Sequence, residues 1–560
     1  MNPKPWLSQY PADVPAEISF DPAMTLHGMM ARTVARHPER PAFSCMGHTI
    51  TFRRLDELSQ AFAGWLQSVG IRKGSRVALM MPNVLQYPIC LFGLLRAGCS
   101  AVNVNPLYKA RELQYQLNDS GAEVIVVAEN FARTLETVLD KTKVRHVVVT
   151  SVGEEMGFKG LFIDFALRHL MKKIESYSLP NAVLFSQVLK QGKNKFKPVD
   201  VVGNDIAFLQ YTGGTTGVSK GAILTHSNMV ANQIQVLTWV KPYINVEERQ
   251  VMITPLPLYH VFSLLANCLL MTSIGAESVL ITDPRNIPKM VAEIGRYRFS
   301  IITGVNTLYN ALLNNKDFQK LDFSKLKISL GGGMSVQKSV ADRWQEVTGV
   351  PLSEAYGLTE TSPGITVNPL NLDAYNGSIG VPIPSTDVVL CDENGNDVGI
   401  GEVGEIGVKG PQVTKGYWKR DDETVRAFSR DGYFMTGDLA VMDDKGFFKL
   451  VDRKKDMILV SGYNVYPNEV EAVASMCPGV LECAAIGIPD PRSGEKVKLF
   501  VVKSAPSLTE ETLMKFCRTN LAGYKRPREI EFRDSLPKSN VGKILRRELR
   551  QPSDAEDKAA

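Results

Sequence analysis

Short runs of apolar residues alternate with longer segments of helical apolar spacing between residues 76 and 330. Runs that are apolar at every position suit strands covered on both faces, which are typical of parallel sheets flanked by helices. The expected strands lie at residues 76–81, 123–127, 146–150, 206–211, 252–254, 278–282, 300–303 and 327–330. The pattern therefore predicts an α/β protein whose large N-terminal part contains parallel sheets.

The pattern changes after residue 378, where short strands alternate with Gly, Asp and Asn turns up to residue 449. This spacing predicts a small antiparallel β subdomain. A wholly charged run at 452–456 follows, and then a tail with expected helices that begin near Asn468 and Ser507 between further strands. We therefore expect an N-terminal domain at 1–452, a hinge at 453–456 and a smaller, mobile α+β domain at 457–560.

The composition is that of an ordinary soluble protein and excludes several classes. Of the 560 residues 44% are hydrophobic, and the net charge of +5 comes without a basic stripe, which argues against a nucleic-acid partner. The eight cysteines form no Cys-x-x-Cys pair, so no zinc ribbon or thioredoxin-type site is indicated. Scattered thiols and an N-terminus without a signal-peptide pattern favour a cytoplasmic protein.

Two segments raise the question of membrane contact. The uncharged stretch 251–276 is interrupted by two prolines and His260, and its apolar part is shorter than the ~20 residues of a membrane span, so we expect a buried strand and helix. At 163–174, Ile163, Leu167, Leu170 and Ile174 recur at helical spacing opposite basic residues. This pattern fits a helix lying on the inner face of a membrane, or one packed on its own domain.

The segment 211–221 (Tyr-Thr-Gly-Gly-Thr-Thr-Gly-Val-Ser-Lys-Gly) has the composition of a phosphate-binding loop. It follows an expected strand and precedes a helix expected near Asn228. Glycines allow several backbone N–H groups to point at one anion, while hydroxyls and Lys220 add further donors. No Gly-Lys here is followed by Ser or Thr, so it is not a Walker A loop. A flexible turn is the alternative interpretation.

Two other matches in the sequence have weaker structural context. The Gly-x-Ser-x-Gly at 217–221 would make Ser219 the nucleophile of a serine esterase, with His226 or His260 as its base. The Gly-x-Gly-x-x-Gly at 399–404 precedes a β run rather than a helix, so we expect a turn there and not a dinucleotide site.

Four motifs together resemble those of the adenylate-forming acyl-CoA synthetases, a superfamily that includes luciferases and peptide-synthetase adenylation domains. They are the phosphate loop, Tyr-Gly-Leu-Thr-Glu-Thr at 356–361, the block 431–456, and Pro-Lys-Ser-Asn-Val-Gly-Lys at 537–543. The chain is most similar to bacterial long-chain-fatty-acid–CoA ligases. The resemblance implies that a fatty carboxylate attacks ATP, releasing pyrophosphate, and that coenzyme A then displaces AMP from the acyl adenylate.

The resemblance also implies roles for single residues around ATP. The phosphate-binding residues would be Thr212, Gly213, Gly214, Thr215, Thr216, Gly217, Lys220 and Thr359. Glu360, together with Thr215, would bind Mg²⁺, a hard cation that takes carboxylate and phosphate oxygens. The adenine and ribose would contact Gly332, Gly333, Tyr356, Asp438 and Arg453.

The remaining implied roles concern the two half-reactions. Lys543 would bridge the fatty carboxylate and the α-phosphate as charge develops, and His260 would lie near the substrate carboxylate. Lys455 would be the hinge about which the C-terminal domain rotates, and Gly462 would leave room for coenzyme A. Without the resemblance, Lys543 would be interpreted as a surface lysine and His260 as a packed core residue.

Other functions remain open at this point. A serine esterase explains only the match around Ser219, and a non-catalytic nucleotide-binding protein would not need Lys543. A ligase for medium-chain or other carboxylic acids would share all four motifs. The sequence does not decide the preferred chain length or the oligomeric state, for which a homodimer is one alternative.

Overall fold

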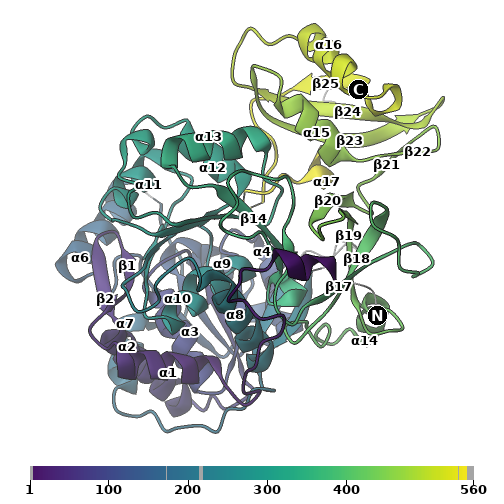
Figure 1. Cartoon of the computed structure of the whole chain (residues 1–560). Helices are drawn as coiled ribbons and strands as arrows, with labels where there is room; N and C mark the ends of the chain where they lie inside the picture. The colour runs from purple at the N-terminus through teal and green to yellow at the C-terminus, as the bar shows by residue number, and fades with distance from the viewer. Residues whose placement is uncertain (1–3, 172, 213–218, 540–541, 551–560) are drawn as a thin grey trace.

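Two large β-sheets form the body of the protein (Figure 1). The computed structural model describes residues 4–171, 173–212, 219–539 and 542–550. The first sheet has the strand order β16-β15-β14-β13-β12-β10-β11-β1-β2 and the second β7-β6-β5-β3-β4-β8-β9. Parallel pairs fill the middle of both sheets, and antiparallel pairs occur at β2, β9, β15 and β16.

The strands of the first sheet are β1 (Pro41–Cys45), β2 (His48–Thr51), β10 (Val251–Thr254), β11 (Glu277–Leu280), β12 (Ile301–Gly304), β13 (Ile328–Gly331), β14 (Leu352–Gly357), β15 (Gly364–Val367) and β16 (Val381–Pro382). Those of the second are β3 (Arg76–Met80), β4 (Ser100–Asn103), β5 (Val124–Ala128), β6 (His146–Thr150), β7 (Val183–Leu184), β8 (Ile206–Thr212) and β9 (Lys220–Thr225). All of the strands expected from the apolar runs are present. Between residues 76 and 330 the runs did not predict β4, β7 and β9, which are short or carry polar residues at their ends. Outside that range they did not predict β1, β2, β14, β15 and β16.

Helices cover both sheets and fill the space between them. Phe62 and Leu91 share one core with Phe43 of the first sheet and Val77 of the second, which places α2 and α3 between the two. A separate core packs α11, α12 and α13 on the first sheet, and another packs α4 and α5 on the second. The helices here are α1 (Leu26–Arg36), α2 (Phe52–Ser68), α3 (Gln86–Arg96), α4 (Ala110–Ser120), α5 (Ala132–Glu136), α6 (Gly157–Phe165), α7 (Phe185–Gly192), α8 (His226–Val240), α9 (Val261–Ser263), α10 (Leu270–Ser273), α11 (Ile287–Ile294), α12 (Asn306–Leu313) and α13 (Lys338–Thr348).

Short 3₁₀ and π turns complete the body. They are η1 (Pro5–Gln9), η2 (Glu129–Phe131), η3 (Leu139–Lys141), η4 (Ala166–Leu170), η5 (Leu264–Leu269), η6 (Phe318–Lys320) and η7 (Thr359–Thr361). The stretch 251–276 forms β10, α9, η5 and α10, and its apolar residues are buried, as predicted. No helix among the described residues is long and apolar enough to cross a membrane. All eight cysteines are buried and free.

The small antiparallel sheet predicted after residue 378 is present. Its strands run in the order β17-β18-β19-β20. Trp6 of the N-terminal segment packs on this sheet, with its ring 6.0 Å from that of Phe448. The elements are β17 (Asp387–Cys391), β18 (Val403–Lys409), α14 (Asp421–Ala427), β19 (Phe434–Met442) and β20 (Phe448–Arg453).

The C-terminal part forms its own sheet with its own core, above the body in Figure 1. Its elements are β21 (Ile458–Val460), β22 (Tyr463–Val465), α15 (Pro467–Ser475), β23 (Val480–Asp490), β24 (Gly494–Lys503), α16 (Glu510–Asn520), η8 (Gly523–Lys525), β25 (Glu529–Phe532) and α17 (Arg546–Leu549). The expected helix start at Ser507 is wrong, because Thr509 accepts the N–H of Thr512 and caps α16. The α/β class, with parallel sheets, a small β subdomain and an α+β tail, is confirmed.

Candidate active site

The predicted phosphate loop connects two neighbouring strands of the second sheet. Gly213, Gly214, Thr215, Thr216 and Gly217 lie outside the described residues. Thr212 ends β8 and Lys220 begins β9, and these two residues pair across the antiparallel register. The helix expected near Asn228 is present as α8, which begins at His226 behind the N-cap Thr225, and β9 lies between it and the loop.

Beside this loop, a chain of contacts links Lys220 to Glu360. The Lys220 ammonium pairs with the carboxylate of Glu423 and lies 5.3 Å from the centre of the Tyr417 ring. The Tyr417 hydroxyl donates a hydrogen bond of 2.7 Å to Glu360, whose pKa is raised by burial. Sequence reasoning missed Tyr417 and Glu423, for which the only cue was the aromatic pair after Gly416.

A second group gathers the residues predicted to bind the nucleoside. Asp438 on β19 lies opposite Arg453 on β20, and its carboxylate is 3.2 Å from the Arg453 guanidinium. The Tyr356 hydroxyl, at the end of β14, donates a 2.7 Å hydrogen bond to the same carboxylate. Asp438 is nearly buried, so this pairing is well shielded from solvent. The structure thus brings together three residues that are far apart in the sequence.

The glycines after β13 lie close to this group. A Cβ at Gly332 would be 3.0 Å from the ring of Phe262 and 3.2 Å from the carbonyl oxygen of Ala355, the neighbour of Tyr356. Gly333 has a φ of +79°, which side chains rarely adopt. Only glycine fits both positions without displacing its surroundings. Thr359 begins η7, directly before Glu360.

Lys543 reaches this site from the C-terminal part. The Thr307 hydroxyl, on α12 of the body, donates to the carbonyl oxygen of Gly542 at 3.3 Å. Burial and the charge of Arg453 lower the pKa of Lys543 to about 8, against a raising effect of Asp438. Burial and the charge of Lys543 in turn lower the pKa of His260 to about 4. Lys543 therefore shares one electrostatic environment with the nucleoside group and with His260.

A cluster of ion pairs surrounds the predicted hinge. Arg546, three residues after Lys543, pairs with the carboxylates of Asp452 at 3.3 Å and Glu471 at 2.8 Å. Lys455 itself is exposed. Gly462 occupies the β21–β22 turn with a φ of +83°, and nothing lies within 4 Å of the position its Cβ would take. The structure places Gly462 on the surface and Lys543 at the site.

The features that suggested other activities have ordinary structural roles. The Ser219 hydroxyl donates to the carbonyl oxygen of Thr212, and antiparallel β9, rather than a helix, follows it. A nucleophile elbow requires a strand-to-helix turn, so this geometry does not support an esterase. The glycine-rich stretch 399–404 forms a turn that leads into β18, as predicted.

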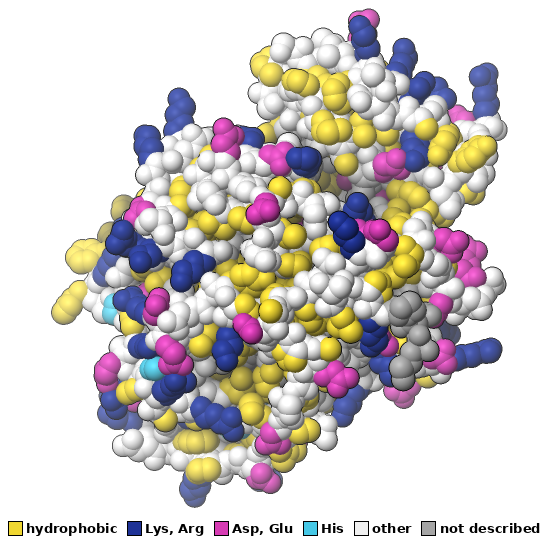
Figure 2. All heavy atoms as spheres, viewed as in Figure 1, with side chains coloured by type: hydrophobic (Ala, Val, Ile, Leu, Met, Phe, Trp, Pro, Cys, Tyr) yellow, Lys and Arg dark blue, Asp and Glu magenta, His cyan; other side chains and the backbone are white. Residues whose placement is uncertain are grey.

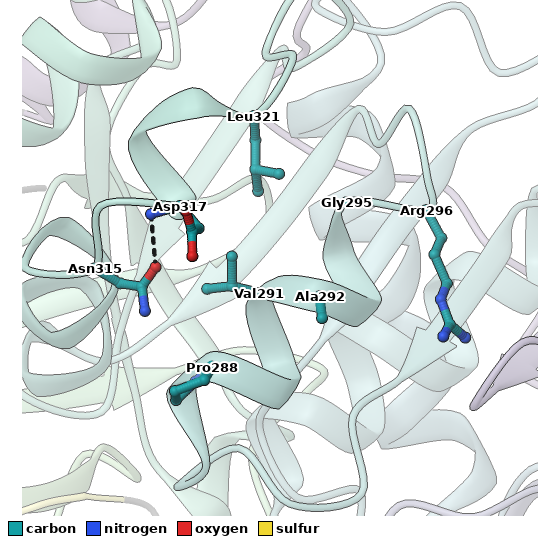
Figure 3. Close-up of a pocket in the computed structure, with 8 residues that line it drawn as sticks. All are labelled: Pro288, Val291, Ala292, Gly295, Arg296, Asn315, Asp317 and Leu321. Atoms are coloured by element: carbon teal, nitrogen blue, oxygen red, sulfur yellow. Dashed lines mark hydrogen bonds between the residues drawn. The ribbon is translucent and has the colours of Figure 1, made fainter.

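A surface cavity of about 280 Å³ lies elsewhere, between α11 and the loop after α12 (Figure 3). Val291, Ala292 and Leu321 form its apolar wall, and Asn315 and Asp317 form part of its rim. The Asn315 side chain accepts a hydrogen bond of 2.9 Å from the Asp317 N–H. Its lining contains none of the described site residues, so we do not assign it to the reaction.

Glu354, two residues before Tyr356, should make stability depend on pH. Burial raises the pKa of its carboxyl to about 8, although the Tyr375 hydroxyl donates to it. Below pH 4.5, the ordinary pKa of the group, Glu354 is protonated in both the folded and the unfolded protein and does not lower the free energy of unfolding. As pH rises from 4.5 toward 8, the unfolded protein releases this proton first, so the free energy of unfolding falls. We expect Glu354→Gln to remove a penalty of roughly 2–4 kcal/mol at pH 8. Thermal midpoints of both proteins from pH 5 to pH 8 test this; parallel curves would contradict it.

The fold is a large parallel α/β body, and a small C-terminal unit meets it beside the cluster of Tyr356, Asp438 and Arg453. The AMP-binding enzyme model matches residues 30–418, and the model of the AMP-binding enzyme C-terminal domain matches residues 469–543. The chain belongs to the AMP-binding enzyme family.

Individual members of this family are similar to the chain over almost its whole length. A long-chain-fatty-acid–CoA ligase of Escherichia coli is 55% identical over 550 residues, which cover 98% of each chain. A Bacillus subtilis protein of the same name is 38% identical, over 98% of this chain and 97% of its own. The anthranilate CoA ligase AuaEII with anthranoyl-AMP superposes with a TM-score of 0.85 at 26% identity, covering 96% of this chain and 98% of the other.

Proposed function

We propose that this protein activates long-chain fatty acids with ATP and transfers them to coenzyme A. The fatty carboxylate attacks the α-phosphorus of ATP, pyrophosphate leaves, and an acyl adenylate forms. The thiol of coenzyme A then attacks the acyl carbon, and AMP leaves. Two observations carry this proposal: Gly542 is held against α12 by Thr307 while Lys543 interacts electrostatically with Asp438, Arg453 and His260, and the chain matches long-chain-fatty-acid–CoA ligases over 98% of its length.

Different residues of the site bind the nucleoside, bind the phosphates and stabilise charge in the first half-reaction. Asp438 accepts hydrogen bonds from the ribose hydroxyls and Arg453 donates to them, while Tyr356 and the backbone at Gly332 enclose the adenine. Lys220 and the loop before it hold the terminal phosphates. Lys543 supplies a cation where the carboxylate and the α-phosphate meet, so that negative charge develops next to a positioned positive one.

Mg²⁺ fits the acidic side of this site. Glu360 is buried, receives a hydrogen bond from Tyr417 and lies near Lys220, so a carboxylate is held in place beside the expected triphosphate. Mg²⁺ usually takes one or two carboxylates plus phosphate oxygens. When bound, it would neutralise phosphate charge and orient the leaving pyrophosphate. Thr359 and Thr215 would complete the polar surroundings of the phosphates.

The second half-reaction needs a different arrangement of the C-terminal domain. With Lys543 at the site and Gly462 on the surface, the present arrangement suits adenylation. We propose that residues 453–456 form the hinge, with Lys455 at the turning point, and that rotation brings Gly462 toward the nucleotide to admit coenzyme A. The domains would accordingly span 1–452 and 457–560.

The test is the release of AMP and pyrophosphate with Mg-ATP, coenzyme A and saturated fatty acids from short to long. We expect AMP and acyl-CoA to form together, at a rate that peaks with long chains. A peak with medium chains would reassign the substrate. Turnover of a simple ester without ATP consumption would contradict the ligase and favour a serine esterase with Ser219 as its nucleophile.

The protein is proposed to work in the cytoplasm, with peripheral contact to the inner face of the membrane that holds its substrate. The expected amphipathic helix at 163–174 supports this contact, but the residues that face outward differ from those expected. Ile163 and Leu167, expected on the membrane face, pack against the core of the body instead. Leu170 of the expected face is exposed, and so is a different face of the helix that precedes it.

A further inference from the structure

The segment formed by α6 and η4 exposes large apolar side chains on its outer face. Their exposed fractions are 85% for Phe158, 66% for Leu161, 76% for Phe162, 56% for Phe165, 73% for Leu170 and 45% for Met171. Within α6 the exposed positions have the spacing i, i+3, i+4 and i+7, which places them on one side of the helix. Contiguous exposed apolar surface of this kind marks an interaction site.

This outer face is fixed by the contacts beneath it. A Cβ at Gly160 would lie 1.8 Å from the carbonyl oxygen of Gly153, so only glycine lets α6 approach the preceding loop this closely. The Asp164 carboxylate accepts hydrogen bonds from the Ser151 hydroxyl at 2.6 Å and from the Gly153 N–H at 2.8 Å. Ile163 packs into the core on the same side. The helix therefore has one anchored face and one face with no covering element among the described residues.

Basic side chains surround the exposed face. Lys159, His169 and Lys173 are exposed, and so is Arg168, although its guanidinium pairs with the carboxylate of Glu129 at 2.5 Å. The one acidic residue between 157 and 171 is Asp164, whose carboxylate is turned inward, as its hydrogen bonds show. Figure 1 places α6 at the edge of the molecule, and Figure 2 shows apolar side chains projecting at that edge beside clusters of Lys and Arg.

We propose that the outer face of α6 and η4 docks on an anionic lipid bilayer. The phenylalanine and leucine side chains enter the interface, and the lysine side chains beside them, Lys159 and Lys173, contact the lipid phosphates. A second copy of this chain fits less well, because a two-fold contact would bring this surface, with its lysines, against itself. The choice of a bilayer also rests in part on the proposed function, since a long-chain fatty acid partitions into membranes.

The experiment measures vesicle binding without ATP or coenzyme A, so its outcome does not depend on ligase activity. Vesicles of phosphatidylethanolamine with phosphatidylglycerol are compared with vesicles of phosphatidylcholine alone by co-sedimentation. We expect the wild-type protein to prefer the anionic vesicles. The double variant Phe158→Ser/Phe162→Ser should bind these vesicles at least about tenfold more weakly, because most of the inserting surface is removed.

Two further variants separate the contribution of the basic side chains from that of the apolar face and control for the loss of exposed apolar side chains elsewhere. Lys159→Gln/Lys173→Gln should lose the preference for anionic vesicles while keeping weak binding to neutral ones. Ile400→Ser/Met476→Ser removes exposed apolar side chains elsewhere and should bind like the wild type. Unchanged binding of the Phe158/Phe162 variant, with folding verified by circular dichroism, would overturn the proposal. So would a wild-type dimer that this variant converts to a monomer in light scattering, because a second copy would then cover the face.

Discussion

Replacing Lys543 with alanine is expected to reduce adenylate formation about 10²- to 10³-fold, the effect typical of losing one preorganised group that stabilises developing charge. The second half-reaction, started from supplied acyl adenylate and coenzyme A, should keep most of its rate, because Lys543 does not serve it. The two rates are measured separately, by pyrophosphate exchange and by acyl-CoA formation. Equal loss of both in a folded variant would show that Lys543 has another role.

The neighbouring lysine provides a matched control. Lys538 pairs with Glu482 at 2.5 Å, outside the site, and Lys538→Ala should leave both half-reactions near their wild-type rates. The pH profile gives an independent readout. Since burial and Arg453 lower the pKa of Lys543 to about 8, its charge is present below this pH and adenylation should slow as pH rises through it. Lys543→Arg, which stays charged, should lose that limb of the profile.

Replacing Glu360 with glutamine should lower adenylation about 10²-fold and raise the Mg²⁺ concentration needed for half-maximal rate. The amide keeps the shape of the side chain but removes the negative charge proposed to hold Mg²⁺. ATP binding at varied Mg²⁺, followed by calorimetry, measures the same change without turnover. A Mg²⁺ dependence identical to that of the wild type would contradict the role assigned to Glu360.

A variant of Tyr417 separates the contribution of the hydrogen bond to Glu360 from that of the Glu360 charge. Tyr417→Phe removes the hydroxyl that donates to Glu360 but keeps the ring beside Lys220, so we expect a loss of about tenfold or less, in line with one typical hydrogen bond. Its requirement for Mg²⁺ should shift in the same direction as that of Glu360→Gln. Glu346→Gln, an exposed position on α13, should change neither quantity.

The sequence by itself determined the class of fold and the chemistry. Runs that are apolar on both faces require cover on both sides, and this requirement alone locates strands such as 146–150 and 206–211. The glycines, hydroxyls and lysine of residues 211–221 indicated a phosphate site, whereas the positions expected for magnesium and ribose came from the resemblance to the adenylate-forming family. Short strands with polar ends, such as β4, escaped this reasoning because their register depends on neighbours.

Tertiary structure decided which of these residues meet and which surfaces stay uncovered. Lys543 lies at the site through a contact between Gly542 and Thr307, and no local pattern encodes a contact between positions so far apart. Tyr417 gained its place only because the chain after β18 returns to Glu360 and to β9. Periodicity likewise shows that the segment after residue 157 has apolar residues at helical spacing. Which of its faces is covered depends on packing partners elsewhere in the chain, and these bury Ile163 and leave Phe162 in solvent.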